Sequence, residues 1–465
     1  KSDVDASFNL KADIASPTFN SVIKLNNISL TPITGGVWEQ LGSTVDNVNG
    51  GNGIWSVAIS KDGLTIAYGA LYGGSGGITR VYQYINSEWT QIGQDILAEN
   101  AGDQFGVSVS LSSNGLTLAV GANKNDGGGT DSGHVRIYQY ANSVWTQLGQ
   151  DINGEAAGDR MGSGSVSLSD DGTIVIIGAF MNDGNGSNSG HARIFQYINS
   201  AWTQLGQDID GEYSGNLSGI RTAISSDGFT VAISAQHNAD NGYLSGHVRI
   251  YQYNNSAWTQ LGQDIDGEAA SDQSGVSVSL SSNGLTVAIG ADMNDGGGSN
   301  SGHVRVYQYT DSTWTQLGQD IDGEAANDNS GYSVSLSSNG LTVAIGANKN
   351  DGGGTDSGHV RVYQYTNSTW TQIGPDIDGE NANDEFGFEV ALSGDGMRVV
   401  IISRYGSLNG GTGYMQTYAL PLGGLYINNS ITTTGIVSNG DTIFNGSVSG
   451  ITSTMVGLGN VENTS

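Results

Sequence analysis

The sequence predicts an all-β protein, a seven-bladed β-propeller built from four-stranded antiparallel blades. Three observations carry this prediction. The 465 residues include 73 Gly and only 4 Pro, which favours short strands joined by tight turns over long helices. Each repeat contains four short runs with the alternation typical of the strands of a propeller blade. The repeat itself is marked by tryptophans 51 to 57 residues apart, at Trp38, Trp89, Trp145, Trp202, Trp258, Trp314 and Trp370, and such a period indicates a repeat protein.

The sixth repeat shows how the strands are assigned. Residues 331–337 alternate and form the first strand, and Asn339 and Gly340 predict a two-residue hairpin turn into the second strand, 341–347. A long loop rich in Gly and Asp follows. Residues 359–365 form the third strand, and a short turn through Asn367 and Ser368 leads to the fourth, 370–376.

Alternation along these strands explains why the units would form a ring. In the first strand Tyr332, Val334 and Leu336 point to one side and the serines between them to the other. Each blade therefore has a bulky face and a small-residue face. Since a single blade cannot bury its bulky face alone, we expect neighbouring blades to pack bulky face against small face around a closed ring.

The ends of the repeat predict how the ring closes. The last unit supplies only three strands, at residues 387–392, 397–403 and 413–419. Its missing fourth strand is found at the other end of the repeat, where residues 38–42 read W-E-Q-L-G. We therefore expect the N-terminal strand to complete the last blade, which removes an exposed sheet edge.

Composition excludes several classes of partner. The chain has 45 acidic and 16 basic residues, a formal charge of −29, which argues against nucleic acid and anionic membranes. No apolar run is long enough to span a membrane, and no membrane insertion is expected. Cysteine is absent, so disulfides and thiolate metal sites are excluded. The chain has no signal peptide and begins at Lys1, so we expect a processed or excised piece.

The repeat has the consensus G-x-S-V-S-L-S-x-[ND]-G-x-T-V-A-I-G-A. In this pattern it resembles the FG-GAP repeats of integrin α-subunit propellers, and the similarity covers residues 38–419. This resemblance implies a propeller but does not fix a function. Calcium-binding members of that family carry a D-x-D-x-D-G loop between the first two strands, where this chain has S-S-N-G at 337–340, so calcium is not expected there. The F-G and G-A pairs stand at Phe105-Gly106 and Phe386-Gly387, and at Gly121-Ala122, Gly290-Ala291 and Gly346-Ala347.

The flanks resemble a second group of proteins. Residues 11–19, K-A-D-I-A-S-P-T-F, and 457–465, G-L-G-N-V-E-N-T-S, are similar to phrases of phage tail fibres and related virion fibres. The sequence thus divides into an N-terminal fibre-like segment (1–36), the propeller (37–421) and a C-terminal fibre-like β segment (422–465). Residues 425–454 are too poor in apolar side chains for a monomeric core, which suggests a homotrimer through the flanks. A flexible linker is the alternative.

One histidine recurs at the same position of five repeats, and it is a candidate for a catalytic or metal site. Because one near-identical histidine per blade cannot converge on one substrate around a ring, the series favours architecture over catalysis. The arginines two residues further on are expected to hydrogen-bond blade to loop. No Ser-His-Asp pattern and no sialidase box occur, so we predict no catalytic residues and no enzyme. The histidines are His134, His191, His247, His303 and His359.

Strand direction should gather both long loops of every blade, with most of the acidic residues, on one face. There Asp320, Asp322 and Glu324 are weak candidate ligands for calcium, with solvated loops or arginine pairs as the alternative. No cofactor is otherwise expected. These loops also hold most of the differences between blades, so they supply the candidate ligand-binding residues His237, Asn238, Asp240, Asn241, Asp183 and Asn185.

The function predicted from these features is a non-enzymatic virion fibre or tail-fibre-like protein. Its propeller would be an adhesion head at the virion surface that binds a host-surface glycan or protein receptor. One alternative is a cell-surface or secreted FG-GAP-type adhesion protein of a marine microbe or alga. Another is a structural spacer that binds nothing.

Overall fold

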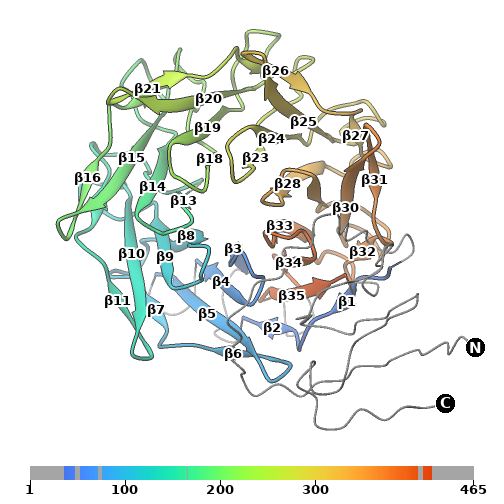
Figure 1. Ribbon diagram of the computed structural model, residues 1–465, viewed down its shortest axis with the longest axis horizontal. Helices are drawn as coiled ribbons and strands as arrows, with labels where there is room; N and C mark the ends of the chain where they lie inside the picture. The colour runs from blue at the N-terminus through green and yellow to red at the C-terminus, as the bar shows by residue number, and fades with distance from the viewer. Residues whose placement is uncertain (1–35, 48–52, 72–75, 165, 407–411, 421–465) are drawn as a thin grey trace, which may run out of the picture. The chain divides into compact units, whose positions relative to one another are not determined.

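A computed structural model describes residues 36–47, 53–71, 76–164, 166–406 and 412–420. These residues form seven antiparallel sheets arranged in a ring (Figure 1), which confirms the predicted fold class. The described part of the chain contains no helix, and therefore no helix that is long and apolar enough to cross a membrane. The ring is one compact unit, Trp38–Ala419. The predicted fibre-like flanks lie almost wholly outside the described residues.

Each blade contains the same strands, counted outward from the axis of the ring. The innermost strands are β3 (Ile54–Ile59), β8 (Phe105–Leu111), β13 (Val166–Leu168), β18 (Thr222–Ile224), β23 (Ser277–Leu280), β28 (Ser330–Leu336) and β33 (Phe386–Leu392). The second strands are β4 (Thr65–Ala70), β9 (Thr117–Ala122), β14 (Ile174–Ala179), β19 (Thr230–Ala235), β24 (Thr286–Ala291), β29 (Thr342–Ala347) and β34 (Arg398–Ser403). The third strands are β5 (Ile78–Ile85), β10 (His134–Ala141), β15 (His191–Ile198), β20 (His247–Asn254), β25 (His303–Thr310), β30 (His359–Thr366) and β35 (Tyr414–Ala419).

The outermost strand of each blade consists of two pieces, both paired with the third strand. The first pieces are β6 (Glu88–Gln91), β11 (Val144–Gln147), β16 (Ala201–Gln204), β21 (Ala257–Gln260), β26 (Thr313–Gln316), β31 (Thr369–Gln372) and, in the last blade, β1 (Glu39–Gln40). The second pieces are β7 (Ile96–Leu97), β12 (Ile152–Asn153), β17 (Ile209–Asp210), β22 (Ile265–Asp266), β27 (Ile321–Asp322), β32 (Ile377–Asp378) and β2 (Val45–Asp46).

The gap between the two pieces corrects the prediction of one continuous fourth strand, and it has a structural cause. Between β26 and β27 the chain bends away to bind the next blade. The indole N–H of Trp370 donates to Leu317 O at 2.6 Å. Gln319 meets the backbone of the same residue twice, because its side-chain amide donates to Trp370 O and accepts from Trp370 N. The repeated W-T-Q-L-G-Q phrase is therefore a clamp between blades.

The blades pack as the alternation predicted. Ala288, on the small-residue face of β24, lies in one core cluster with Val334 and Ile345, on the bulky face of the next blade. Small residues are required where the backbones approach closely: a Cβ on Gly346 would lie 2.1 Å from Gly387 O. The hydrophobic core is thus divided among the interfaces between blades, and each blade depends on its neighbours for burial.

The turn between the first and second strands differs from the predicted two-residue hairpin. Ser337 N donates to Thr342 O, so four residues lie in the loop, and Gly340 has a positive φ of +72° whereas Asn339 does not. Ser338 is thereby free to bond neighbouring blades: its N–H donates to Gly394 O, and its carbonyl accepts from Ser282 N, both at 2.9 Å. The same bond continues around the axis as a closed ring through Lys61, Ser113, Asp170, Ser226, Ser282, Ser338 and Gly394.

The N-terminal strand closes the ring as predicted. β1 pairs antiparallel with β35, with Glu39 opposite Ala419 and Gln40 opposite Tyr418. The indole N–H of Trp38 donates to Ile373 O at 2.9 Å, which repeats the clamp of the other blades. Strands from both ends of the repeat therefore share one sheet.

Candidate functional site

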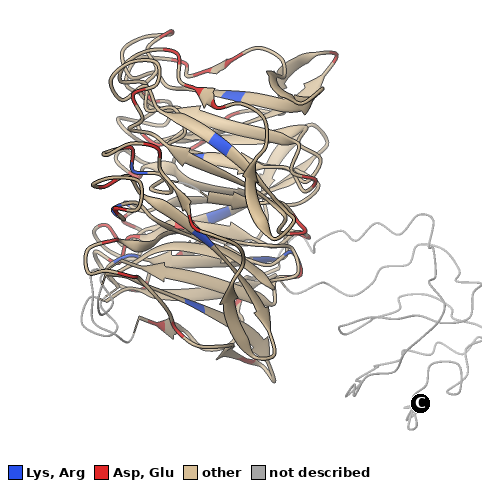
Figure 2. Ribbon diagram, turned by 90° about the vertical axis from the view of Figure 1, so that its left-hand side faces the viewer, with Lys and Arg blue, Asp and Glu red and all other residues tan. Residues whose placement is uncertain are grey.

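The long loops lie together on one face of the ring, which we call the loop face; the face with the tight turns is the turn face. Each blade contributes the loop between its second and third strands and the crossover to the next blade. Their backbones pair: Ser330 N donates to Ser301 O at 2.9 Å, and Gly323 N donates to Gly302 O at 2.8 Å. Figure 2 shows acidic residues in the loops along one side of the ring. The predicted adjacency of the two loops is confirmed.

A buried histidine begins the third strand of five blades, just beneath the loop face. Each is 1% or 2% exposed. His303 shows the arrangement: it lies opposite Ala291 of β24 on one side and Asp322 of β27 on the other. Its Nδ1 lies 3.9 Å from Glu268 Oε2, beyond hydrogen-bonding distance. Among the described residues, the buried Nδ1 atoms of His134, His247 and His303 have no hydrogen-bond partner.

The D-I-D-G-E motif, which contains the second piece of the outermost strand in the third to sixth blades, is divided between two blades. Asp320 lies with His303 of its own blade, whereas Glu324 lies with His359 of the next blade. Asp322 pairs with His303 in the ladder and belongs to neither group. The candidate calcium ligands Asp320, Asp322 and Glu324 therefore do not converge, because the extended β27 and the crossover carry the chain from one blade to the next.

The result is a carboxylate–imidazole–carboxylate group at five junctions between blades. Sequence reasoning placed the histidines correctly in separate blades, but it missed that each is joined by carboxylates from two blades. The groups are Glu99–His134–Asp151, Glu155–His191–Asp208, Glu212–Asp240–His247–Asp264, Glu268–His303–Asp320 and Glu324–His359–Asp376.

Burial and charge determine the protonation of these groups. Burial, and then the neighbouring Arg305, lower the pKa of His303 to about 4, so its imidazole is neutral at pH 7. Arg305 also lies 3.2 Å from Glu268, as the predicted pairing of arginine with loop suggested. Burial, followed by the nearby Asp320, raises the pKa of Asp322. Acidic groups thus crowd around a neutral imidazole, with one arginine to offset them.

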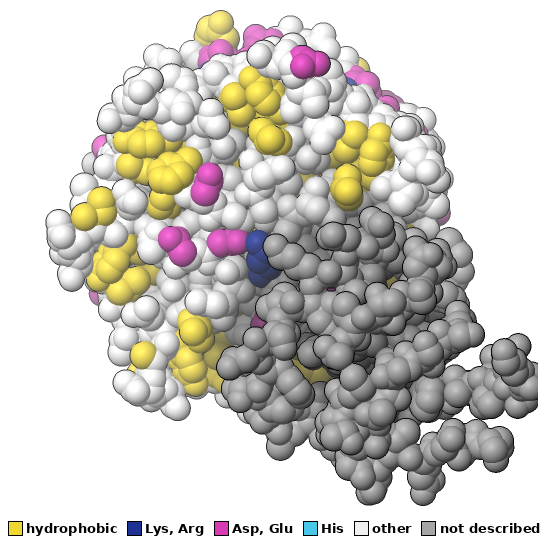
Figure 3. Space-filling view, in the orientation of Figure 1, with side chains coloured by type: hydrophobic (Ala, Val, Ile, Leu, Met, Phe, Trp, Pro, Cys, Tyr) yellow, Lys and Arg dark blue, Asp and Glu magenta, His cyan; other side chains and the backbone are white. Residues whose placement is uncertain are grey.

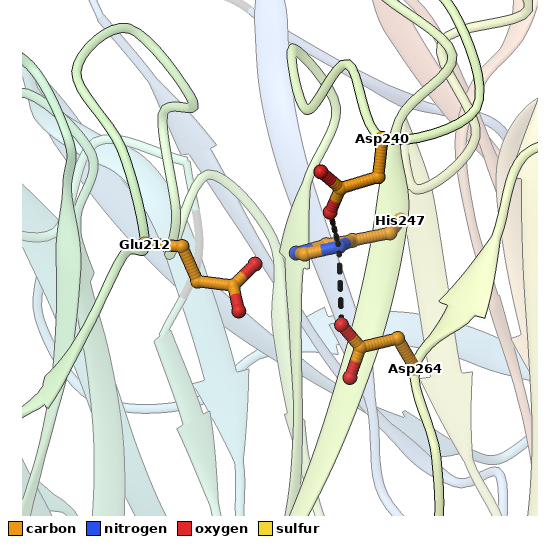
Figure 4. Close-up of side chains that lie close together, drawn as sticks. All are labelled: Glu212, Asp240, His247 and Asp264. Atoms are coloured by element: carbon orange, nitrogen blue, oxygen red, sulfur yellow. Dashed lines mark ion pairs between the residues drawn. The ribbon is translucent and has the colours of Figure 1, made fainter.

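The fourth blade departs from this pattern. Its loop between β19 and β20 carries Asp240 where the third and fifth blades have Gly184 and Gly296. The carboxylates of Asp240 and Asp264 lie on opposite sides of the His247 imidazole, and Glu212 approaches from the preceding crossover (Figure 4). One ligand atom from each of the four residues lies within 4.8 Å of the others. We call these four residues the fourth-blade cluster.

Distances and pKa shifts show how strongly acidic this cluster is. His247 Nδ1 lies 3.8 Å from Asp264 Oδ2 and 4.0 Å from Asp240 Oδ2 and Asp266 Oδ1. Burial raises the pKa of Glu212, and the nearby aspartates raise it further, although Arg249 at 3.4 Å acts in the opposite direction. Glu212 Oε2 is buried without a hydrogen-bond partner among the described residues. Of the carboxylates near His247, only Glu212 forms an ion pair with Arg249.

Two exposed tyrosines flank the fourth-blade cluster. Tyr213 follows Glu212 directly and is 63% exposed; Tyr243 lies in the same loop as Asp240 and is 73% exposed. The fifth blade has Ala269 and Ser299 at the corresponding positions. No sequence prediction singled out these tyrosines, although a large aromatic residue at a position that is otherwise small was a visible signal.

The six predicted ligand-binding residues differ in burial and in hydrogen-bond partners. Asp240 lies in the fourth-blade cluster. Asn238 is fully buried and donates to Asp240 Oδ2, so it supports the loop from within. Asn241 and Asn185 bind the carbonyls of Gly267 and Gly211 in the adjacent crossovers. Asp183 accepts from Asn188 N within its own loop, and His237 is half-buried, with a pKa lowered by burial.

The first and last blades lack the histidine. Ile78 stands at the corresponding position of the first blade, and Tyr414 stands there in the last. Tyr414 donates to Asp384 Oδ2 at 2.9 Å, and Gln416 donates to Glu380 at 3.2 Å. In the last blade the neutral Gln416 therefore stands where the other blades have an arginine. The ring closes without a carboxylate–imidazole group in the first or the last blade.

The turn face carries a small pocket on the axis of the ring. Its volume is about 140 Å³, and it is lined by the hydrogen-bonded backbone ring and by side chains such as Leu280 and Leu336. Lys61 Nζ forms an ion pair with Asp170 at 2.8 Å there. Figure 3 shows this face, on which hydrophobic side chains form separate groups around the ring. With this size and no cluster of titratable groups, the pocket is a weaker candidate site than the fourth-blade cluster.

A comparison with protein families identifies the repeat. The ring of four-stranded blades defines a β-propeller, and residues 96–138 and 321–363 match the family model of the FG-GAP repeat. The chain thus carries FG-GAP repeats in a seven-bladed propeller. No curated protein matches it. Among solved structures it is similar to hydrazine synthase of Kuenenia stuttgartiensis, at 11% identity over 77% of this chain and 94% of that one, with a TM-score of 0.49. A suspected 6-phosphogluconolactonase of Bacteroides uniformis is 12% identical over 70% and 84%, also with a TM-score of 0.49. Neither similarity bears on function.

Proposed function

We propose that the ring is a non-catalytic receptor-binding head on a virion fibre or tail-fibre-like protein at the virion surface. Its ligand is a host-surface glycan or protein, bound on the loop face at the junction of the third and fourth blades. The observation that carries this proposal is the asymmetry of that junction. Tyr213, Tyr243 and Asp240 interrupt, at one place, the repetition of the five junctions that contain a histidine.

The chemistry of the junction suits recognition. Tyrosine offers a flat apolar ring and a polar hydroxyl at a low entropic cost, and it is enriched among the residues that dominate binding energy. Two rings that are more than half exposed belong to no core cluster of the described residues. The neighbouring carboxylates can accept hydrogen bonds from the hydroxyls of a sugar or from a basic peptide.

Repetition of the acidic groups favours binding over catalysis. An enzyme needs an acid and a base placed around one reacting bond, whereas here similar groups recur at five junctions between blades. Each group is centred on a buried histidine. A rigid ring that presents loops on one face is a common arrangement for binding.

The flanks support a virion over a cell surface, through the fibre-like phrases at 11–19 and 457–465. The alternative is a cell-surface or secreted adhesion protein. One observation favours it, since FG-GAP repeats also build the heads of adhesion receptors, which the repeat resembles. Recognition on the loop face is common to both candidates, and the sequence surrounding this chain distinguishes them.

The test replaces the tyrosines with the residues of the fifth blade. The double variant Tyr213→Ala and Tyr243→Ser should fold normally, because both side chains are exposed, and should lose binding to a glycan array or to host cells by at least about tenfold. The matched control is Phe229→Leu on the turn face, which copies Leu285 of the fifth blade. Equal binding by the double variant and the wild type would overturn the proposed site, and loss of binding in the control alone would move it to the turn face.

A further inference from the structure

The fourth-blade cluster contains a buried polar atom that pairing within the protein leaves unsatisfied, as do the groups at His134 and His303. His247 is 1% exposed, and its Nδ1 has no hydrogen-bond partner among the described residues. That nitrogen lies next to carboxylate oxygens at 3.8 to 4.0 Å. A nitrogen of a neutral imidazole can donate a hydrogen bond to a carboxylate oxygen only if it carries the proton. Even then, distances of 3.8 to 4.0 Å are too long for a hydrogen bond. A buried polar atom without a partner is costly and calls for a ligand.

The charge of the cluster points to a cation. Glu212, Asp240 and Asp264 bring three negative charges within reach of one another. Arg249 pairs only with Glu212, at 3.4 Å, and its Nη2 donates to Asp210 O. Asp240 and Asp264 therefore form no ion pair with Arg249. Like charges held this close repel one another unless a positive charge enters.

We propose that the fourth-blade cluster binds one divalent transition-metal cation, of the Zn²⁺ or Mn²⁺ type. His247 Nδ1 and one carboxylate oxygen each from Asp240, Asp264 and Glu212 are the ligands. This proposal concerns a metal site and does not depend on the identity of any receptor.

The donor set selects this class of cation. Ca²⁺ and Mg²⁺ prefer sites made of oxygen alone, whereas imidazole mixed with carboxylates suits Zn²⁺ and its neighbours in the first transition row. Ligands of a tetrahedral Zn²⁺ lie about 3.4 Å apart when the bonds are about 2.1 Å. The four atoms here, all within 4.8 Å of one another, reach that spacing by small side-chain movements on the loop face.

The fourth blade is distinguished from the other four junctions by Asp240. The remaining groups offer one histidine, one aspartate and one glutamate, and glycine occupies the place of Asp240 in the fifth blade, at Gly296. A fourth protein ligand closes the coordination shell of a structural site. Since Glu212 comes from one blade and the other ligands from the next, the cation would tie the two loops that carry Tyr213 and Tyr243.

The experiment measures metal binding directly. The 465-residue protein is stripped with a chelator and titrated calorimetrically with Zn²⁺, Mn²⁺ and Ca²⁺, and equilibrium dialysis gives the bound metal per chain. Asp240→Gly copies Gly296 and removes one ligand. Asp183→Ala, the control, copies Ala239 of the fourth blade and removes one acidic residue from the equivalent loop of the third blade.

We expect one tight Zn²⁺ or Mn²⁺ per chain in the wild type and in Asp183→Ala, and at least about tenfold weaker binding in Asp240→Gly. A gain-of-site variant completes the test. Gly296→Asp should raise the stoichiometry from one to two, because position 296 corresponds to Asp240 and its φ is one that aspartate tolerates. A Cβ at this position lies 2.9 Å from Asn294 Oδ1, so the Asn294 side chain must shift slightly, and Asn238 shows that an asparagine and an aspartate fit together in this loop.

Four results would overturn the proposal. The first is the absence of Zn²⁺ and Mn²⁺ binding to the wild type, and the second is equal affinity in Asp240→Gly and Asp183→Ala. The third is Ca²⁺ binding as tight as that of the transition metals, which would replace the cation class by an oxygen-preferring one. Five equivalent sites in the titration would also reject the special role of the fourth blade.

Discussion

At the scale of one residue, His303 shows how burial makes the ring sensitive to acid. Its imidazole faces Glu268 and Asp320, with Arg305 and Asp272 nearby. Its folded pKa is about 4, against 6.5 for a free histidine. The folded protein therefore binds fewer protons than the unfolded chain between these pH values, and stability decreases as pH falls from 6.5 towards 4. The raised pKa of Asp322 opposes this only at the acidic end.

We therefore predict that the metal-free protein melts at a lower temperature at pH 5.5 than at pH 7. His303 alone should account for about 1 kcal/mol of this loss. His303→Tyr, which copies Tyr414 of the last blade, should show a shallower dependence of melting temperature on pH. Calorimetric scans at several pH values check this, and an identical slope in the variant and the wild type would show that His303 does not titrate as described.

At the scale of one element, the ring depends on β1, a strand of only two residues. It adds two ladder pairs to β35, and Trp38 beside it is 6% exposed and bound to Ile373 O. Without it, the last blade would present β35 as an open edge. The contribution of β1 to the free energy of unfolding thus comes mainly from the buried indole of Trp38 and from covering the edge of β35, and less from the number of paired residues.

Removal of residues 1–43 should therefore lower the melting temperature by roughly 10 °C, since loss of a buried tryptophan alone costs about 3–5 kcal/mol. Removal of residues 1–35 is the matched control, because it retains Trp38 and β1. Thermal denaturation followed by circular dichroism measures both. If the two truncated proteins melt at the same temperature, the strand does not stabilise the ring.

Elements were more predictable than contacts between them. Strand alternation and the tryptophan period predicted the blades, the Asn367–Ser368 turn, in which both residues have positive φ, and the closing strand. The prediction of a two-residue turn at Asn339 was wrong because the backbone of Ser338 forms hydrogen bonds with both neighbouring blades, and a local sequence pattern does not reveal such bonds. The cluster at Glu212 was missed for the same reason: its members are distant in sequence and meet only across a blade junction.

At the scale of the whole molecule, the ring is self-sufficient. Its cores lie between adjacent blades, and its seven sheets are joined both by the clamps at the rim and by the hydrogen-bonded ring at the axis. Nothing in this arrangement requires a second copy. Self-association is therefore expected to come from the flanks, which lie outside the described residues.

We predict that residues 37–421 alone are monomeric, whereas the protein that keeps the flanks predicted to be fibre-like, with adequate downstream sequence, forms a closed trimer. Light scattering coupled to size-exclusion chromatography gives both masses. A stable oligomer of the isolated ring would assign association to the propeller and contradict the prediction.

The pairing of Glu39 with Ala419 has a consequence for any longer polypeptide that contains this ring. Paired strands lie about 5 Å apart, so the backbone departs almost where it arrived, after an excursion of nearly four hundred residues. The two ends of the ring therefore lie side by side in one blade. Tension applied to the two ends would separate the short ladders of β1 and β2 with β35 before it reached any of the six other blades. A ring with another number of blades could occupy the same place without changing the separation of the two ends.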